Sequence, residues 1–398
     1  MVNSVPPFPT QPPVATPDES APPGVPVVCP APLTHSGPEH DAELNDLVAR
    51  LGDPSPVVGP LTFPRGTLQP DGRLDLCKQA LSPLDARRVI TAAARSPHAS
   101  HLLLGTNSLG TAGIAALADA LQPGHGMRTL YLGCNHVDGE ALVPLADRLY
   151  QDATVQALWL KRNPIGDAGV ATVARLLAAN PAIRTLDLTN TGMTIAGLRD
   201  LVDALRERPP LHRLYAGGNG WGPDAGPLFA ALLAAGLDEL YLAAGHLGDS
   251  GITPIASTVE ALATAGRRVA LGLGGNGLTP DGVRSLAAGL SGLSTLDLAR
   301  PPSAIVLRAA PNLVGDEGAA ALAQALPGSR LRRLDLRHTG VTGRGAKLLV
   351  AALEEGTELE LLGLGSGVPR RLKRTVTGSL RAASPPAEDI QAIASVYR

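Results

Sequence analysis

The chain has 398 residues and a formal net charge of −2 at pH 7, so it lacks the basic field that nucleic-acid-binding domains usually show. No apolar run approaches the roughly 18 residues of a membrane span, so we expect no membrane partner. The cysteines are few, Cys29, Cys77 and Cys134, and Cys77 and Cys134 are expected to lie too far apart for a disulfide. Together these features predict a cytoplasmic protein with free thiols.

The N-terminal region is predicted to contain a tail and a cap. Residues 1–38 hold twelve prolines and no apolar periodicity, so they are predicted to be disordered. We favour a solubilising extension over the SH3-binding motif that residues 6–9 would also allow. Residues 39–73 are predicted to form an N-terminal cap, a short helix over 41–51 and then a hairpin that turns at the Pro-Asp-Gly sequence of 69–72.

From residue 74 to 368 the chain repeats the phrase Leu-x-Leu-x-x-Asn-x-apolar-Gly, followed by a stretch rich in Ala and Leu. The alternation predicts a short strand with both leucines inward, and the later stretch has the apolar spacing of a helix. Strands joined through helices on one side are parallel, so the units form one concave sheet. Eleven units start at Leu74, Leu102, Leu130, Leu158, Leu186, Leu214, Leu240, Leu271, Leu296, Leu334 and Leu362.

This pattern resembles the ribonuclease-inhibitor-like subfamily of leucine-rich-repeat proteins, whose repeats of about 28 residues each carry a helix. The resemblance covers residues 74–368 and implies an α/β horseshoe solenoid of about eleven strand-helix repeats with a parallel concave sheet. Mammalian ribonuclease inhibitors are acidic and cysteine-rich, unlike this chain. We therefore infer the fold from the resemblance and not the inhibition of a ribonuclease.

One repeat contains an insertion. The unit that starts at Leu296 spans 38 residues, because the thirteen residues 299–311 separate Leu298 from Asn312 where two are usual. We expect this loop to project from the rim of the concave sheet. It is either a neutral insertion or an element that carries function.

The last residues are predicted to cap the C-terminal end of the solenoid. Leu372, Val376 and Leu380 recur at helical spacing, and a second helix is expected to start after Ser384. Both helices are assigned to a helical C-terminal cap over residues 369–398.

The middle residue of each Leu-x-Leu strand should face outward on the concave side. Four of the ten aromatic residues occupy this position, and their neighbours toward the turn are mostly small, so we expect the rings to be exposed. Exposed Tyr and Trp are enriched at interface hot spots, although these rings could instead merely stack and fill the concave floor. The predicted partner-binding surface consists of Tyr131, Trp159, Lys161, Arg162, Asp187, Tyr215, Tyr241, Asp297, Arg300, Asp335 and Arg337.

The sequence contains no motif that predicts catalysis, a cofactor or a metal site. Residues 272–277 match the dinucleotide fingerprint GxGxxG, but they lie inside a leucine repeat and no βαβ unit surrounds them. The histidines are scattered, and no HExxH, paired CxxC or GxSxG motif is present. We predict a non-enzymatic, monomeric scaffold or inhibitor that binds an unidentified protein on its concave face. The alternative is a regulator of a partner enzyme, as a resemblance to Ran GTPase-activating proteins would imply.

Overall fold

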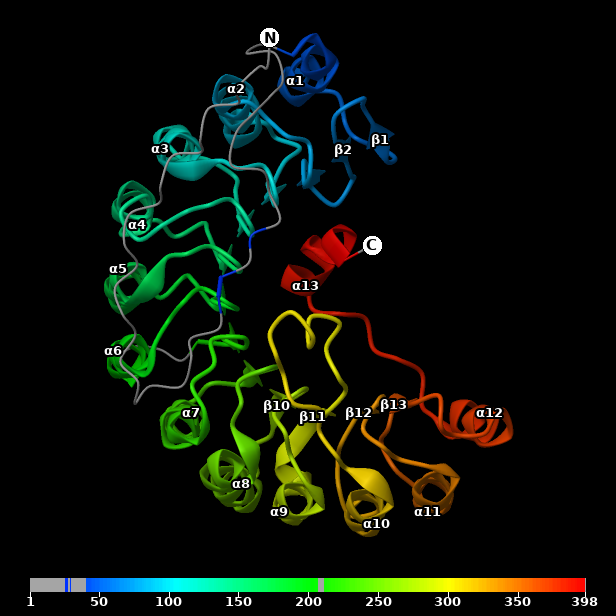
Figure 1. Cartoon of the computed structure of the whole chain (residues 1–398). Coiled ribbons are helices and arrows are strands. Elements are labelled where there is room, and N and C mark those ends of the chain that lie inside the picture. The colour runs from blue at the N-terminus through cyan, green and yellow to red at the C-terminus, as the bar shows by residue number, and fades with distance from the viewer. Residues whose placement is uncertain (1–25, 28, 30–40, 207–210, 398) are drawn as a thin grey trace, which may run out of the picture.

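The computed structural model describes residues 26, 27, 29, 41–206 and 211–397. This part of the chain forms one sheet of thirteen strands that lie side by side in sequence order (Figure 1). The strands are β1 (Leu61–Thr62), β2 (Thr67–Leu68), β3 (Arg73–Asp75), β4 (His101–Leu103), β5 (Thr129–Tyr131), β6 (Ala157–Trp159), β7 (Thr185–Asp187), β8 (Arg213–Tyr215), β9 (Glu239–Tyr241), β10 (Val269–Gly272), β11 (Leu293–Asp297), β12 (Arg333–Leu336) and β13 (Leu361–Leu364).

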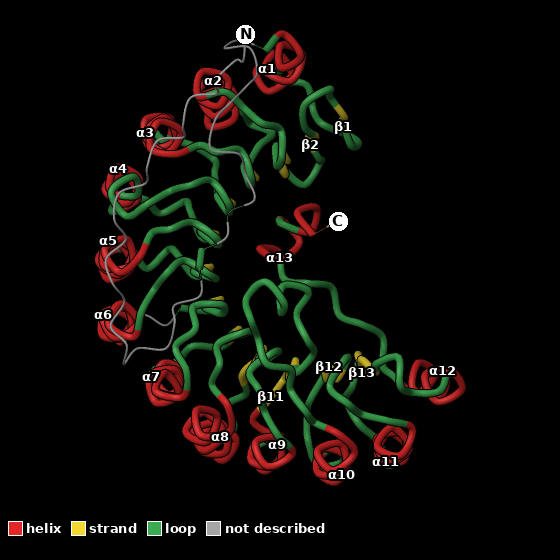
Figure 2. The backbone as a smooth tube through the Cα atoms, viewed as in Figure 1, coloured by secondary structure: helices red, strands yellow, loops and turns green. Residues whose placement is uncertain are grey.

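Helices form the outer layer of a horseshoe, with the sheet on the inner side (Figures 1 and 2). One helix follows each strand from β3 to β13, and the outer layer is therefore wider than the inner one. The helices are α1 (Asn45–Gly52), α2 (Pro83–Arg95), α3 (Gly110–Ala120), α4 (Val143–Leu149), α5 (Gly166–Ala179), α6 (Ile195–Arg206), α7 (Gly226–Ala234), α8 (Gly248–Thr264), α9 (Pro280–Ala288), α10 (Gly315–Ala325), α11 (Gly343–Glu354), α12 (Arg370–Ser379) and α13 (Glu388–Ala392). Short 3-10 helices are η1 (Ala42–Leu44), η2 (Pro223–Ala225), η3 (Leu290–Gly292) and η4 (Ala394–Tyr397).

The leucines of the repeat set the register of the sheet. The first leucine of each unit pairs with the first leucine of the next, without a break from Leu74 to Leu362. Both leucines of a strand point away from the concave face, as Leu158 and Leu160 do, and they are buried against the helices in one continuous core. This confirms the predicted α/β solenoid and its eleven parallel strands.

Asparagines fix the turn in six of the repeats: Asn107, Asn135, Asn163, Asn219, Asn276 and Asn312. The Asn135 side chain donates from Nδ2 to the carbonyl oxygens of Leu104 (3.0 Å) and Leu132 (2.8 Å), and its Oδ1 accepts from the backbone N–H of Asn107 (2.9 Å). A buried backbone group needs a partner, and the amide supplies three in one residue. Each such turn therefore ties one repeat to the one before it and holds the strands that bear the concave side chains.

The first edge of the parallel sheet is covered by the chain itself. Strands β1 and β2 pair antiparallel, and β2 pairs antiparallel with β3 after a turn at residues 69–72. Helix α1 adds Leu47 and Leu51 to the core beneath them. The open backbone groups of β3 are thus paired rather than left to solvent.

The two C-terminal helices lie in different places. Helix α12 packs against α11 and β13 and buries Val376, at the end of the solenoid. Residues 381–387 then run exposed across the opening, and α13 and η4 lie on the concave face (Figures 1 and 2). The placement of the last helix in a C-terminal cap was therefore wrong, because its apolar side chains contact the aromatic strands rather than α12.

The insertion folds back over the turns of earlier repeats. Leu307 is buried together with Ala304, Ala309 and Ala244, and the Leu307 carbonyl oxygen lies 3.3 Å from His246 Nε2. Ile305 and Val306 remain exposed at the tip. The loop therefore lies along the rim. We had expected it to project from the rim, and that expectation was wrong.

Most of the predicted disordered tail, residues 1–38, lies outside the described residues. The three described residues contact the turns of the solenoid. Asn190 Nδ2 donates to the Pro26 carbonyl oxygen (3.1 Å), and Cys29 Sγ lies 3.5 Å from His136 Nε2. The described cysteines, at 29, 77 and 134, form no disulfide.

Candidate protein-interaction site

Four aromatic side chains form a continuous row on the concave face, which we call the aromatic ladder: Tyr131, Trp159, Tyr215 and Tyr241. The ring centroids are 6.3 Å apart between Tyr131 and Trp159, 5.2 Å between Trp159 and Tyr215, and 4.4 Å between Tyr215 and Tyr241, whose planes differ by 11°. Such offset contacts are favourable between aromatic rings. The ladder continues across β7, which carries Asp187 at the same position.

Glycines make room for the rings. A Cβ atom on Gly105 would lie 2.6 Å from the Tyr131 ring, and one on Gly272 would lie 2.4 Å from the Tyr241 ring. Side chains at these two positions would therefore force the rings to move. The absence of a side chain at Gly105 and Gly272 therefore leaves the space that the Tyr131 and Tyr241 rings occupy.

The ladder is not exposed, which corrects the expectation from the sequence. Tyr131 and Trp159 retain only 3% and 1% of their accessible surface, and Tyr215 and Tyr241 are half-buried. Ile393, itself 2% exposed, belongs to the same buried cluster as Tyr131 and Trp159. The rings are hidden because the last residues of the chain return to cover them.

An arginine-centred network borders the ladder. Arg213 donates from Nε and Nη2 to the two carboxylate oxygens of Glu239 (2.7 and 2.9 Å), and it also pairs with Asp389 on α13. The Tyr241 hydroxyl donates to Glu239 (3.0 Å). Burial opposes ionisation of Glu239, but hydrogen bonds from His212 and Arg213 and the charge of Arg213 lower its pKa to about 2. The site therefore holds a fixed charge pair beside an apolar row.

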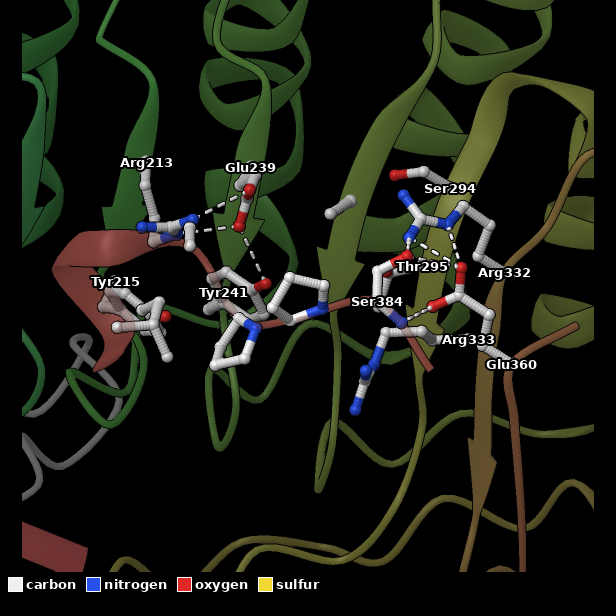
Figure 3. Close-up of a pocket in the computed structure, with 15 residues that line it drawn as sticks. Arg213, Tyr215, Glu239, Tyr241, Ser294, Thr295, Arg332, Arg333, Glu360 and Ser384 are labelled. Atoms are coloured by element: carbon white, nitrogen blue, oxygen red, sulfur yellow. Dashed lines mark hydrogen bonds and ion pairs between the residues drawn. The ribbon is translucent and has the colours of Figure 1, made fainter. Parts of the chain in front are cut away.

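A cavity of about 660 Å³ lies between residues 384–387, which precede α13, and the strands β8 to β13 (Figure 3). At its far end, Arg332 Nε donates to Glu360 Oε1 (2.7 Å), and Glu360 Oε2 accepts from the backbone N–H of Ser384 (3.0 Å). Arg333 also lines the cavity and is exposed. The cavity is thus lined by charged and polar groups next to the aromatic ladder.

The predicted charged residues fall into two groups, of which the first adjoins the ladder. Lys161 Nζ lies 5.7 Å from the centre of the Tyr131 ring, in the geometry of a cation–π contact. Asp187 is buried between Trp159 and Tyr215, and burial raises its pKa. Arg162 occupies a left-handed turn position (φ 56°) and is half-buried.

The second group lies on or just after strands β11 and β12, apart from the ladder. Arg337 pairs with Asp335 (2.6 Å), and the backbone N–H of Ala299 donates to Asp297 (2.9 Å). Burial raises the pKa of Asp297. Arg300 is exposed at the start of the insertion. The structure therefore does not join all eleven predicted residues into one continuous patch.

The sequence pattern pointed to the outward residue between the two leucines, but not to the outward residue before the first leucine. Arg213 and Thr185 occupy that second position, and both contact α13. Side chains alternate along a strand, so both neighbours of an inward leucine face the concave side. This alternation could have revealed Arg213 and Thr185. No local pattern indicates that the segment after Ser384 returns to them.

Among residues 26–27, 29, 41–206 and 211–397, no group of three or more His, Cys, Asp or Glu could hold a metal ion. Over the same residues, no helix has both the length and the apolar character that crossing a membrane requires.

Known proteins share the fold. A family model described as Leucine Rich repeat matches residues 330–350. The chain has a leucine-rich-repeat fold. A chain from the crystal structure of the Rad7 and Elc1 complex in yeast matches 79% of this chain and 75% of its own length, at 15% identity and a TM-score of 0.53.

Two bacterial structures match less well. An internalin from Listeria monocytogenes has a TM-score of 0.40 at 14% identity, over 87% of this chain and 96% of that one. A leucine-rich-repeat-containing protein from Legionella pneumophila has a TM-score of 0.39 at 15% identity, over 57% and 73%. No curated protein matches the sequence.

Proposed function

We propose that this protein is a non-enzymatic scaffold that binds a protein partner through the aromatic ladder on its concave face. The observation that carries the proposal is that the ladder already accommodates a segment of the chain itself, residues 390–396 of α13 and η4, with Ile390, Ile393 and Val396 in one cluster with the rings. A surface that can bury Ile393 against Tyr131 and Trp159 has the shape and chemistry to bury an apolar side chain of another protein.

The composition of the site supports a protein partner. Aromatic residues and arginine are enriched in the energetically dominant centres of protein interfaces, and this site combines four rings with Arg213 and Arg128. The ladder runs from β5 to β9, about 20 Å at the usual spacing of parallel strands. That length suits a short helix laid into a groove.

The remaining parts of the proposal rest on composition and pattern. The regular helix in each repeat supports placement in the ribonuclease-inhibitor-like subfamily. The small number of cysteines, with none of 29, 77 and 134 in a disulfide, supports a reducing compartment, and we propose a cytoplasmic monomer. A partner enzyme is one possible occupant, and a change in its turnover on binding would mark the protein as a regulator.

Affinity capture of partners from an extract of the source organism tests this proposal. Trp159→Ala and Tyr215→Ala should each weaken capture by about 1–2 kcal/mol, because each removes a ring from the centre of the site. Asp200→Ala, an exposed change on the convex helix α6, is the control and should have no effect. Circular dichroism should show that all three variants keep the fold. Equal capture by the three variants would contradict the proposal.

A further inference from the structure

We propose that residues 387–397 are an intramolecular ligand of the aromatic ladder, and that the protein partner presents a short helical segment of the same chemistry. That chemistry is two acidic residues followed by apolar residues three apart, as in Glu388, Asp389, Ile390, Ile393 and Val396. The inference rests on the proposed function, because it names the kind of segment that the same site binds.

The apolar side chains of the segment face the ladder. Spacing of three places Ile390, Ile393 and Val396 on one side of a helical turn. Ile393 is buried with Tyr131 and Trp159, and Ile390 and Val396 pack at the edge of the same cluster. This cluster is separate from the main core of the solenoid, so the contact is a docking of two surfaces rather than an extension of the fold.

The acidic side chains meet basic and polar groups of the sheet. Arg128 Nη2 donates to Glu388 Oε2 (3.0 Å), and the Thr185 hydroxyl donates to Asp389 Oδ2 (2.6 Å). Arg213 completes the cradle around Asp389. The site therefore selects a segment whose acidic residues come directly before its first apolar residue.

The backbone of the segment is also held. Arg73 Nη1 donates to the carbonyl oxygen of Gln391 (3.1 Å), from the far side of the horseshoe. Arg73 of β3 and Arg213 of β8 thus both bind the segment, Arg73 at its backbone and Arg213 at the Asp389 side chain. A main-chain contact of this kind is independent of sequence and is open to any helix of similar length.

The chain's own segment is an imperfect ligand. Trp159 Nε1 is buried and has no acceptor among the described residues, and the Ser395 hydroxyl is likewise without a partner there. Helix α13 has five residues, and a helix so short is unstable without the surface that it covers. A partner segment with a longer helix, or with an acceptor for Trp159 Nε1, would make interactions that α13 does not.

The connection to α12 permits release. Residues 381–388 are exposed, and the link contacts the solenoid at the Arg381 N–H, which donates to the Leu359 carbonyl oxygen (2.8 Å), and at Ser384. Because the link is short, it keeps the segment at a high effective concentration beside the ladder. The segment therefore competes with a partner and lowers its apparent affinity without closing the site permanently.

A labelled peptide of residues 385–398 and the full-length protein test the inference. The variant Ile390→Ala/Ile393→Ala should release the internal segment and bind the unmodified peptide at least tenfold more tightly than the wild type does, as measured by fluorescence anisotropy. The control Ile305→Ala/Val306→Ala removes similar side chains from the exposed tip of the insertion and should bind like the wild type.

A second variant guards against a loss of folding in the first. Glu388→Lys/Asp389→Lys reverses the charges of the internal segment, leaves its apolar side chains in place, and should also bind the peptide more tightly than the wild type. Circular dichroism checks that both variants are folded. Absence of peptide binding to both folded variants overturns the inference.

A charge exchange shows whether the peptide binds in the position of α13. In the released variant, Arg128→Glu should weaken binding of the unmodified peptide about two- to fivefold, the range for an exposed ion pair. The peptide change Glu388→Arg should restore it. Restored binding of the changed peptide supports the pairing of residue 128 with residue 388. Weak binding of both peptides would indicate general damage to the site and would overturn the proposed pairing.

Two other outcomes separate the proposals. If no peptide binds but capture of a partner still depends on Trp159, the inference fails and the proposed function stands. If capture does not depend on Trp159, the proposed function fails whatever the peptide does. A wild-type chain that is dimeric in light scattering, and monomeric once Ile390 and Ile393 are replaced, would place the segment on a second copy and overturn the intramolecular ligand.

Discussion

Two parts of the concave face, strands β5 to β9 and strands β11 to β13, have the same backbone arrangement. They differ in their outward side chains, which are aromatic in the first part and mostly charged in the second. Strands β5 to β9 carry the aromatic ladder, and its rings Tyr131, Trp159 and Tyr215 cluster with residues of the C-terminal segment. Strands β11 to β13 carry Asp297, Asp335 and Arg333 and border an open cavity, which reaches as far as β8 and β9. Both parts have the same inward leucines and the same parallel register. Whether a part of the sheet is covered is therefore decided by side chains that the repeat itself leaves free.

The difference follows from hydration. Burying apolar surface stabilises a contact by about 25 cal/mol per Å². A segment with matching apolar residues therefore docks on Trp159 and its neighbours. Removing charged groups from water is unfavourable unless each finds a partner. The second part accordingly stays open, and its best-paired groups, Asp335 with Arg337 and Arg332 with Glu360, pair within the sheet layer.

The largest expected effect compares arginines at the same position in the two parts. Arg213→Ala should lower the free energy of unfolding by about 3–5 kcal/mol, because it removes a buried cation from the half-buried carboxylates of Glu239 and Asp389. Arg333→Ala removes an exposed arginine from β12 and should change stability by less than about 0.5 kcal/mol. Urea unfolding followed by circular dichroism measures both. Similar losses for the two variants would mean that the ion pairs of Arg213 contribute no more to stability than the exposed Arg333 does.

A second pair of variants tests the statement that the two parts share one core. Leu160→Ala, behind the ladder, and Leu336→Ala, in the second part, should each cost about 2–5 kcal/mol, because each leaves a cavity behind a buried strand leucine. Thermal and urea unfolding should give comparable losses for the two. A much larger cost at Leu160 would show that α13 stabilises the core beneath it.

The pH dependence of stability should reveal the fixed charge of the first part. The pKa of Glu239 is lowered from its usual value of 4.5 to about 2 by Arg213 and His212, although burial opposes the shift. A lowered pKa in the folded state gives a stabilisation that is complete above about pH 4.5 and is lost as the pH falls through about 2. Its size is on the order of 2–3 kcal/mol.

Glu239→Gln should remove this part of the acid dependence, as unfolding measured between pH 2 and pH 5 will show. The control Glu354→Gln changes an exposed carboxylate at the end of α11 and should leave the profile unchanged. If the free energy of unfolding falls equally with decreasing pH in the wild type and in Glu239→Gln, the acid dependence comes from a group other than Glu239.

Much of the fold could be predicted, because its determinants are local and repeated. The Leu-x-Leu alternation sets the facing of each strand, and the recurrence of Leu74 in ten later units sets the parallel register. The outward position of Tyr131, Trp159, Tyr215 and Tyr241 follows from the same alternation. Their exposure could not be predicted in this way, since it depends on a segment more than 140 residues away from Tyr241 in sequence.

The sequence by itself determined the repeat: which residues form strands, which leucines are buried, and which side chains face the inside of the horseshoe. These features need only the periods of a strand and a helix and the requirement that each unit bury its apolar side against the next. Only the tertiary structure decided that the last helix covers the aromatic ladder, that the insertion lies along the rim, and that Arg213 holds Asp389. Each of these joins segments far apart in the chain, where no local period constrains the contact. Once the curvature of the solenoid brings the surfaces together, the choice is made by apolar burial and charge pairing.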